Sequence, residues 1–202
     1  MKITVVYESM FGNTHQVAQA ISDGIREANR NADVQCVSVK DASPELIQST
    51  ELLIVGGPTH IRGMTSALSR KMGVKEEQKD EARGEPAHEL QEDAEGPGVR
   101  AWFKGLPTVK DGRAAAFDTR LEFSLAGGAA GGIARRLRKH GYHVVSDPEG
   151  FIVEDAYGPL RAGEIDRAKQ WGAQLVPASV NTTTHSGDSK ESKTPAVRSD
   201  QG

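Results

Sequence analysis

The chain reads Ser9-Met10-Phe11-Gly12-Asn13-Thr14 at the point where an apolar segment, residues 2–7, gives way to an amphipathic one. We interpret this junction as a phosphate site, because the first N–H groups of a helix lack internal partners and the helix dipole adds positive charge there. Gly12 lets the backbone approach a phosphate closely, and Ser9 and Thr14 offer hydroxyl donors. The stretch contains no lysine, so it suits a single phosphate better than a triphosphate.

Apolar residues recur at helical spacing after this junction. Val17, Ile21 and Ile25 share one face, which predicts a helix over about 13–29. Four further segments have the length and apolar content of buried strands: residues 33–39, 52–56, 113–117 and 142–145, the last of which resumes at 151–153. Further helices are expected from Ser43 or Pro44, near 129–139 and near 162–175.

This alternation of strands and helices predicts the fold class. Parallel strands joined by helical crossovers, which are almost always right-handed, give an α/β fold. We expect one domain with a doubly wound five-stranded parallel sheet and helices on both faces. In such sheets the ligand crevice lies beyond the carboxyl ends of the strands, which is where the junction at residues 9–14 falls.

The composition predicts one hydrophobic core and does not indicate a nucleic-acid partner. The chain has 202 residues, 37% of them hydrophobic, which is sufficient for one ordinary core. Its net charge of -3 is too small to indicate nucleic-acid binding. Its one concentrated basic run, residues 135–140, stands before Gly141, and we interpret it as the solvated end of a helix, where cations complement the dipole.

Neither a leader nor a long apolar stretch is visible. The first strand begins directly after Met1, and no apolar run has the length that a bilayer requires, so we expect a cytoplasmic protein with no membrane insertion. Cys36 is the only cysteine and forms no internal disulfide. Its apolar neighbours favour a thiol that fills core space over a redox role.

Two stretches depart from the alternating pattern. Residues from about 75 to 98 are strongly acidic and almost free of large apolar side chains, which predicts a charged surface insert. Residues 177–202 are rich in Ser, Thr and Asn without periodicity, which predicts a disordered tail. The folded domain is therefore expected to span residues 1–176.

The order of a hydroxyl residue, two further residues and Gly-Asn-Thr, placed directly after the first strand, resembles the phosphate loop of the flavodoxin family. That loop holds the phosphate of FMN, so the resemblance implies a flavodoxin-like domain in which FMN contacts Ser9, Met10, Phe11, Gly12, Asn13 and Thr14. Many flavodoxins carry a second hydroxyl residue at the position of Phe11, so one phosphate donor is missing here. Met10 and Phe11 either cover the ribityl phosphate or pack on neighbouring loops.

The loop after the third strand also resembles the family, because Gly-Gly-Pro-Thr is common there in flavodoxin-like proteins. Backbone groups of this loop face the flavin N5 in the family, and the resemblance extends that role to Thr59, His60 and Ile61. It also makes Pro58 and Arg62 candidate flavin contacts. The usual aromatic residues are missing, so His60 either stacks on the ring or faces solvent. Arg62 either points into water or lies beside the ring, where a cation would favour the reduced flavin.

The segment after the fourth strand is the third candidate contact with the flavin. Its small polar start suits the pyrimidine end of the ring, and the candidates are Asp118, Thr119 and Arg120, with Phe123 as a cover for the outer face. The glycine-rich run at 127–132 lacks the spacing of a dinucleotide-binding loop. We expect it to open a closely packed helix.

Three other functions of similar folds find no support in the motifs. A phospho-receiver domain needs an aspartate at the end of its third strand, where this chain has Gly56, Gly57 and Pro58. The lysine-containing loop of triphosphate-binding enzymes is absent, as is the Gly-x-Ser-x-Gly turn of many hydrolases.

Two redox functions and one binding function remain. The favoured hypothesis is an FMN electron carrier, a flavoprotein that needs no catalytic side chain and no metal. The alternative is an FMN-dependent NAD(P)H:quinone-type oxidoreductase, and the third is a flavodoxin-fold binding module without flavin. The expected partners are redox proteins or a small quinone-like acceptor, and the sequence specifies no oligomeric state.

Overall fold

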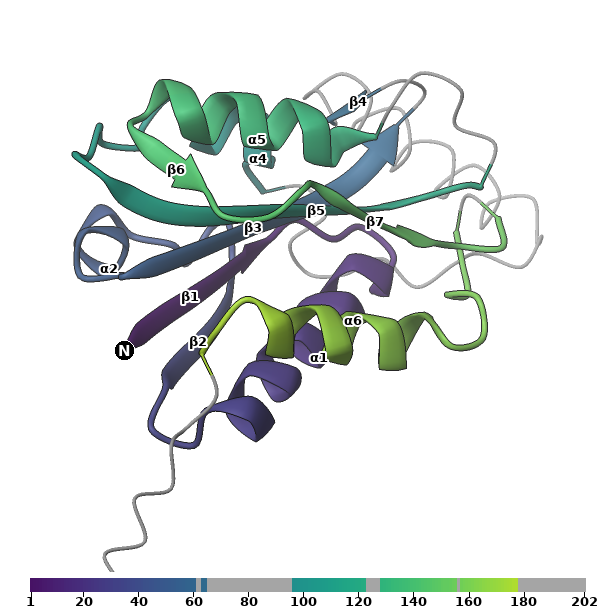
Figure 1. Ribbon diagram of the computed structural model, residues 1–202. Coiled ribbons are helices and arrows are strands. Elements are labelled where there is room, and N and C mark those ends of the chain that lie inside the picture. Colours follow the sequence, from purple (N-terminus) through teal and green to yellow (C-terminus); the bar gives the residue numbers. More distant parts are fainter. Residues whose placement is uncertain (61–62, 65–95, 123–127, 156, 178–202) are drawn as a thin grey trace, which may run out of the picture.

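Figure 1 shows the computed structural model, which describes residues 1–60, 63–64, 96–122, 128–155 and 157–177. A parallel sheet with the strand order β2-β1-β3-β5-β6 forms its centre. The strands span Lys2–Tyr7 (β1), Asp33–Ser38 (β2), Leu52–His60 (β3), Gly63–Met64 (β4), Gly112–Arg120 (β5), Tyr142–Val144 (β6) and Glu149–Ile152 (β7). The predicted doubly wound five-stranded parallel sheet is confirmed.

The fifth strand position is shared by two short strands. β6 pairs with Gly112–Ala114 at the start of β5, and β7 pairs with Phe117–Arg120 at its end, both in parallel. This interruption corresponds to the predicted strand that resumes at 151–153. The two-residue β4 pairs antiparallel with the end of β3.

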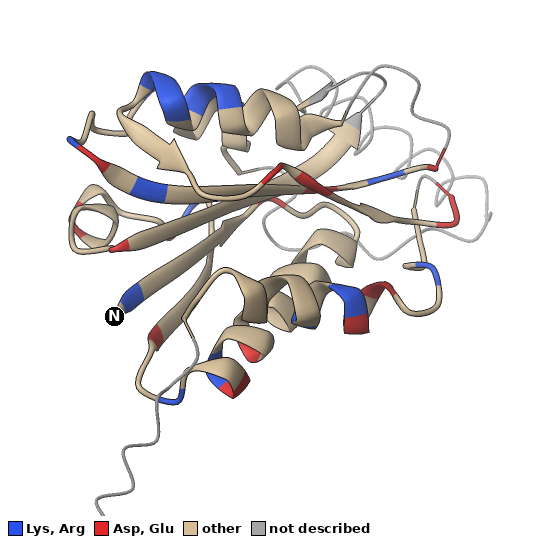
Figure 2. Cartoon of the chain, in the orientation of Figure 1, with Lys and Arg blue, Asp and Glu red and all other residues tan. Residues whose placement is uncertain are grey.

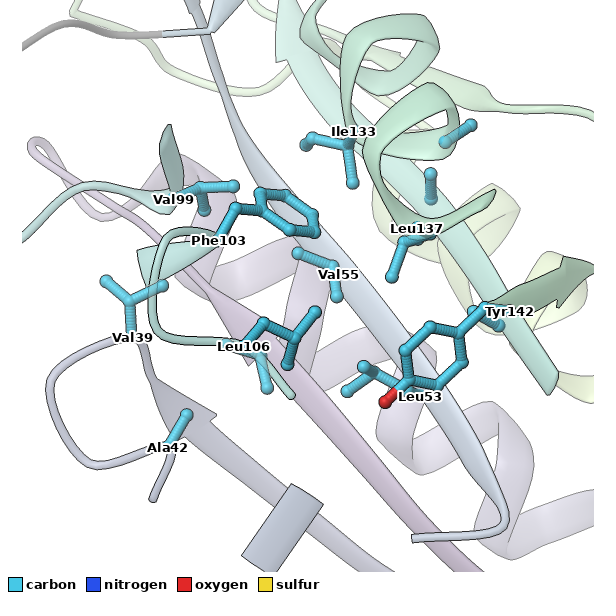
Figure 3. Close-up of a cluster of buried hydrophobic side chains, with 14 of the residues drawn as sticks. Val39, Ala42, Leu53, Val55, Val99, Phe103, Leu106, Ile133, Leu137 and Tyr142 are labelled. Carbon is cyan, nitrogen blue, oxygen red and sulfur yellow. The ribbon is translucent and has the colours of Figure 1, made fainter. Parts of the chain in front are cut away.

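Helices cover both faces of the sheet (Figure 1). They span Asn13–Ala28 (α1), Pro44–Gln48 (α2), Val99–Trp102 (α4), Ala129–Lys139 (α5) and Glu164–Gln174 (α6). α1 and α6 pack on one face, where Ile21, Ile25 and Trp171 join the core. α4 and α5 pack on the other, where Phe103 and Leu137 meet Val55 of β3 (Figure 3).

Local chemistry explains where several helices begin and end. The Ser43 hydroxyl accepts from the Leu46 N–H and Pro44 follows it, a favourable start for α2. α5 ends at Lys139, with His140 as its C-cap and Gly141 next, at a φ of 87°. The exposed Arg138 and Lys139 lie in the last turn of α5 (Figure 2), which confirms the interpretation of the basic run as a solvated helix end.

Two central strands are longer than the sequence predicts. β3 continues from Gly56 to His60, and β5 continues from Phe117 to Arg120. Parallel pairing of Pro58 with Thr119, and of Arg120 with Ile152 in β7, sustains these extensions. Candidate residues expected in loops therefore lie on strand ends: Pro58, Thr59, His60, Asp118, Thr119 and Arg120.

Several sequence predictions fall outside the described residues, or at their edge. Ile61, Arg62 and Phe123 are not described, and neither are residues 75–95 of the predicted insert nor 178–202 of the predicted tail. Gly98, at the end of the stretch predicted as a surface insert, is buried and directly precedes α4. None of the helices that the structure describes combines the length and apolar character needed to cross a membrane.

Cys36 lies on β2 and packs against the core between the sheet and α1. Its thiol is free, and burial raises its pKa to about 11. The thiol is therefore neutral at physiological pH, which agrees with the predicted space-filling role.

Candidate functional site

A cavity of about 280 Å³ opens at the carboxyl ends of β1, β3 and β5. This is the edge at which parallel α/β sheets bind ligands, and the volume is near the lower end for a ligand pocket, roughly 300 Å³. The cavity is lined by Ser9, Met10, Phe11, Asn13, Thr14, Pro58, Thr59, Thr119, Arg120, Leu121 and Val153. Three segments predicted from the sequence, at 9–14, 58–59 and 119–120, thus meet around one space.

The stretch from Ser9 to Thr14 forms the turn that leads from β1 into α1. Gly12 has a φ of 84°, a conformation that glycine adopts without strain, and no side chain caps the first turn of α1. The Ser9 hydroxyl is buried and has no hydrogen-bond partner among the described residues. Leaving such a group unpaired costs about 1–3 kcal/mol, so this turn is suited to an acceptor-rich ligand such as a phosphate.

A second loop, after β7, holds the turn in shape. The Asn13 side-chain amide donates to the Tyr157 carbonyl at 2.8 Å, and the Phe11 ring packs edge-on against the Tyr157 ring with centroids 5.0 Å apart. Phe11 therefore packs on a neighbouring loop while it also lines the cavity. The Asn13 amide is thus engaged within the protein, whereas the Ser9 hydroxyl and the backbone N–H groups of the turn can donate to a ligand.

Thr14 and Thr119 form a hydroxyl pair on the cavity wall. Both side chains are buried, and their Oγ1 atoms lie 2.8 Å apart. One hydroxyl donates to the other, so the second hydrogen of the pair remains for a ligand. The pair also ties α1 to β5.

Asp118 is fully buried and caps α5; it does not line the cavity. Its Oδ2 accepts from the Thr59 hydroxyl at 3.0 Å and from the Ala130 N–H at 2.9 Å. The Thr59 Oγ1 in turn accepts from the Ala129 N–H at 2.8 Å. The two side chains thereby replace the cap that Gly128, which precedes α5, has no side chain to provide.

The electrostatics of the cavity are dominated by Arg120, the only charged residue among the described lining residues. Its side chain is 31% exposed, and its Nε lies 3.7 Å from the Asp118 Oδ1. Desolvation raises the pKa of the Asp118 carboxyl, while the bond from Ala130 and the charge of Arg120 oppose that shift. Within the described residues, no cluster of His, Cys, Asp and Glu could hold a metal ion.

Two residues that line the cavity, Leu121 and Val153, are not among those predicted from the sequence. Leu121 is exposed at 46%, the one large apolar side chain so exposed in the described structure, and Val153 follows the interrupted fifth strand. Val153 could have been predicted to line the cavity, because it is an apolar residue at the carboxyl end of a strand. His60 ends β3 opposite Gly63, but only its backbone is described.

Comparison with known proteins agrees with this geometry. Residues 5–174 match the family model described as Flavodoxin. Over 70 residues, 35% of this chain and 43% of the relative, the chain is 32% identical to a flavodoxin of Clostridium saccharobutylicum. The match with this curated relative thus spans less than half of its length.

Solved structures extend the likeness to most of the chain. A flavodoxin from the domain Archaea shares 23% identity with a TM-score of 0.57 and covers 87% of this chain and 96% of its own. Oxidised Flavodoxin 1 from Bacillus cereus shares 17% identity with the same score, covering 87% and 97%. A WrbA-like flavodoxin from Agrobacterium tumefaciens shares 17% identity with a TM-score of 0.51, covering 86% and 94%. At these identities the likeness shows the fold.

Proposed function

Because the chain belongs to the flavodoxin family, we propose that it binds FMN noncovalently and serves as an electron carrier. The family binds a flavin, typically FMN. The main support for the proposal is the buried hydroxyl of Ser9, which has no hydrogen-bond partner among the described residues. It lies beside the start of α1, where no described side chain forms a cap. These donors suit a dianionic phosphate, and one such group is present in FMN but absent from riboflavin.

Different residues of the cavity would contact different parts of FMN. Ser9, the Thr14–Thr119 pair and the first turn of α1 would hold the phosphate. Leu121 and Val153 offer apolar surface at the same cavity, while Arg120 supplies its positive charge. FMN, when bound, would supply one-electron and two-electron redox chemistry. Redox proteins are the partners that this proposal implies, and the cytoplasm is the expected location.

The phosphate assignment is tested by Ser9→Ala, with Ser22→Ala as a matched control. Ser22 is also buried, but its hydroxyl donates to the Ala18 carbonyl within α1 and does not line the cavity. Loss of a hydrogen bond to a charged group is worth roughly 1.5–3 kcal/mol, so Ser9→Ala should weaken FMN binding by about one to two orders of magnitude. Riboflavin affinity should not change, because riboflavin has no phosphate.

Two results would contradict this assignment. Ser9→Ala could bind FMN as tightly as the wild type, or it could lose FMN and riboflavin equally. Ser22→Ala should bind both flavins normally.

The rate at which NADH or NADPH reduces the bound flavin without a partner protein distinguishes an electron carrier from a quinone reductase. The FMN-loaded protein should be reduced slowly by NADH or NADPH alone and rapidly by a flavodoxin reductase. Rapid oxidation of either nicotinamide without a partner would favour the oxidoreductase.

A further inference from the structure

Arg120 ends β5 with its guanidinium held between two other elements. A Cβ atom added to Gly150 of β7 would overlap the guanidinium, and one added to Gly128, before α5, would lie 2.8 Å from its Nη1. The side chain therefore occupies space that both glycines leave open. Arg120 is held in place by packing, unlike a surface arginine that extends freely into water.

Asp118 stands beside Arg120 but does not neutralise it completely. Its Oδ2 is committed to Thr59 and Ala130, and its buried Oδ1 has no hydrogen-bond partner among the described residues. The 3.7 Å from Oδ1 to the Arg120 Nε is too long for a hydrogen bond. The carboxylate thus attracts and orients the guanidinium without accepting a hydrogen bond from its Nε.

A second carboxylate close to Asp118 is engaged elsewhere. Glu149, which pairs with Phe117 across β7 and β5, forms an ion pair with Arg167. Arg167 is also bonded to Glu164 and lies over the Phe151 ring. Arg120 therefore has Asp118 as its ion-pair partner in the described structure.

We propose that Arg120, oriented by Asp118 and seated between Gly128 and Gly150, makes this protein bind reduced FMN more tightly, relative to oxidised FMN, than it would without that cation. Asp118 is a positioning residue that also moderates the charge. The inference rests on the proposed FMN function. It extends that function by assigning control of the redox potential to residues at this end of the cavity.

The physical reason is the charge that reduction adds. Uptake of two electrons from a redox protein and one proton from solvent leaves the flavin ring with one additional negative charge. At an effective dielectric constant of about 20, a fixed cation at a separation of about 10 Å would favour that form by about tenfold in binding. The quantity measured is the ratio of the dissociation constants of oxidised and reduced FMN, which the bound and free midpoint potentials provide. The cation would multiply this ratio by that factor.

The test compares two arginines of the same strand. Arg120→Gln removes the proposed cation, and Arg113→Gln makes the same change at the opposite, exposed end of β5. The preference for reduced FMN should fall by about tenfold in Arg120→Gln and stay constant in Arg113→Gln. Arg120→Lys should retain part of the preference, because it keeps the charge without the planar group.

Two further variants separate charge from structure. Gly150→Ala displaces the guanidinium without altering the net charge, so it should reduce the preference in the same direction as Arg120→Gln. Asp118→Asn keeps an oxygen that can accept from Ala130 and Thr59 but removes the opposing charge, so it should increase the preference. The preference for reduced FMN should thus change in opposite directions in Asp118→Asn and Arg120→Gln. A loss of packing alone is not expected to produce opposite changes.

The inference is overturned if Arg120→Gln binds oxidised and reduced FMN in the wild-type ratio, or if Arg113→Gln shifts the ratio equally. Failure of the wild-type protein to bind FMN in either redox state would instead overturn the proposed function.

Discussion

The side-chain hydroxyls of Thr14 and Thr119 lie 2.8 Å apart on the wall of the cavity and join residues 105 positions apart in the chain. Thr14 is the second residue of α1, directly after the turn at Ser9–Gly12, and Thr119 lies near the end of β5. The contact therefore brings together two segments that the sequence assigns separately to the flavin.

Thr14→Ala should weaken FMN binding by about one to two orders of magnitude, because the hydroxyl pair loses the donor that it can offer to a charged ligand. Thr50→Ala is the matched control, since Thr50 forms a similar hydroxyl pair with Thr4 at 2.6 Å but does not line the cavity. Fluorescence titration with FMN measures both affinities. An equal loss in the two variants would show that the effect arises from general destabilisation.

Gly24→Ala should destabilise the fold by about 1–3 kcal/mol, because a Cβ atom there would overlap the Lys169 carbonyl where α1 crosses α6. Gly131→Ala, in α5, is the opposite case. A Cβ at Gly131 meets no atom within 4 Å, and alanine favours helix by about 1 kcal/mol. Urea unfolding should show the two variants on opposite sides of the wild type, and a stable Gly24→Ala protein would contradict the close helix contact.

Cys36 should react with iodoacetamide only slowly at pH 8, and the rate should rise with pH towards a midpoint near 11. Because burial raises the pKa from 9.0 to about 11, the folded state favours the neutral thiol. This contribution to stability is complete below pH 9 and is lost as the pH rises to about 11. A midpoint near 9 would show that the thiol is solvated, and Cys36→Ser gives the background rate.

Asn13→Ala should lower FMN affinity, since the Asn13 amide donates to the Tyr157 carbonyl at 2.8 Å. The turn from Ser9 to Thr14 would lose its tie to the loop after β7. Asn29→Ala, at the far end of α1, provides a matched asparagine change away from the cavity. Affinity should fall for FMN more than for riboflavin, and equal losses for the two ligands would argue against a role in shaping the phosphate turn.

The fold could be predicted because its signals are local. Val17, Ile21 and Ile25 mark one helical face, and the apolar run from Leu52 to Val55 marks a buried strand. The ends of β3 and β5 could not be predicted in this way. They are extended by pairing between residues far apart in the chain, such as Pro58 with Thr119, which no local pattern reveals.

The cavity was only partly predictable for the same reason. Ser9 and Thr14 stand in a recognisable motif at a strand-to-helix junction, and the structure places both on the cavity wall. The role of Asp118 could not be predicted locally, because its carboxylate accepts from the backbone N–H of Ala130, twelve residues later, and so caps α5. Gly128, directly before α5, has no side chain that could cap this helix. The sequence therefore shows that a side-chain cap must come from another residue, but it does not show that this residue is Asp118.

Isothermal titration of the flavin-free protein with FMN, riboflavin and FAD measures the proposed flavin binding. We expect one FMN bound per chain, with riboflavin weaker by at least about tenfold because it lacks the phosphate that Ser9 and the start of α1 would hold. FAD should also bind more weakly, since the turn at Ser9–Thr14 is suited to one terminal phosphate. Equal affinity for riboflavin and FMN, or no binding of any flavin, would contradict the account.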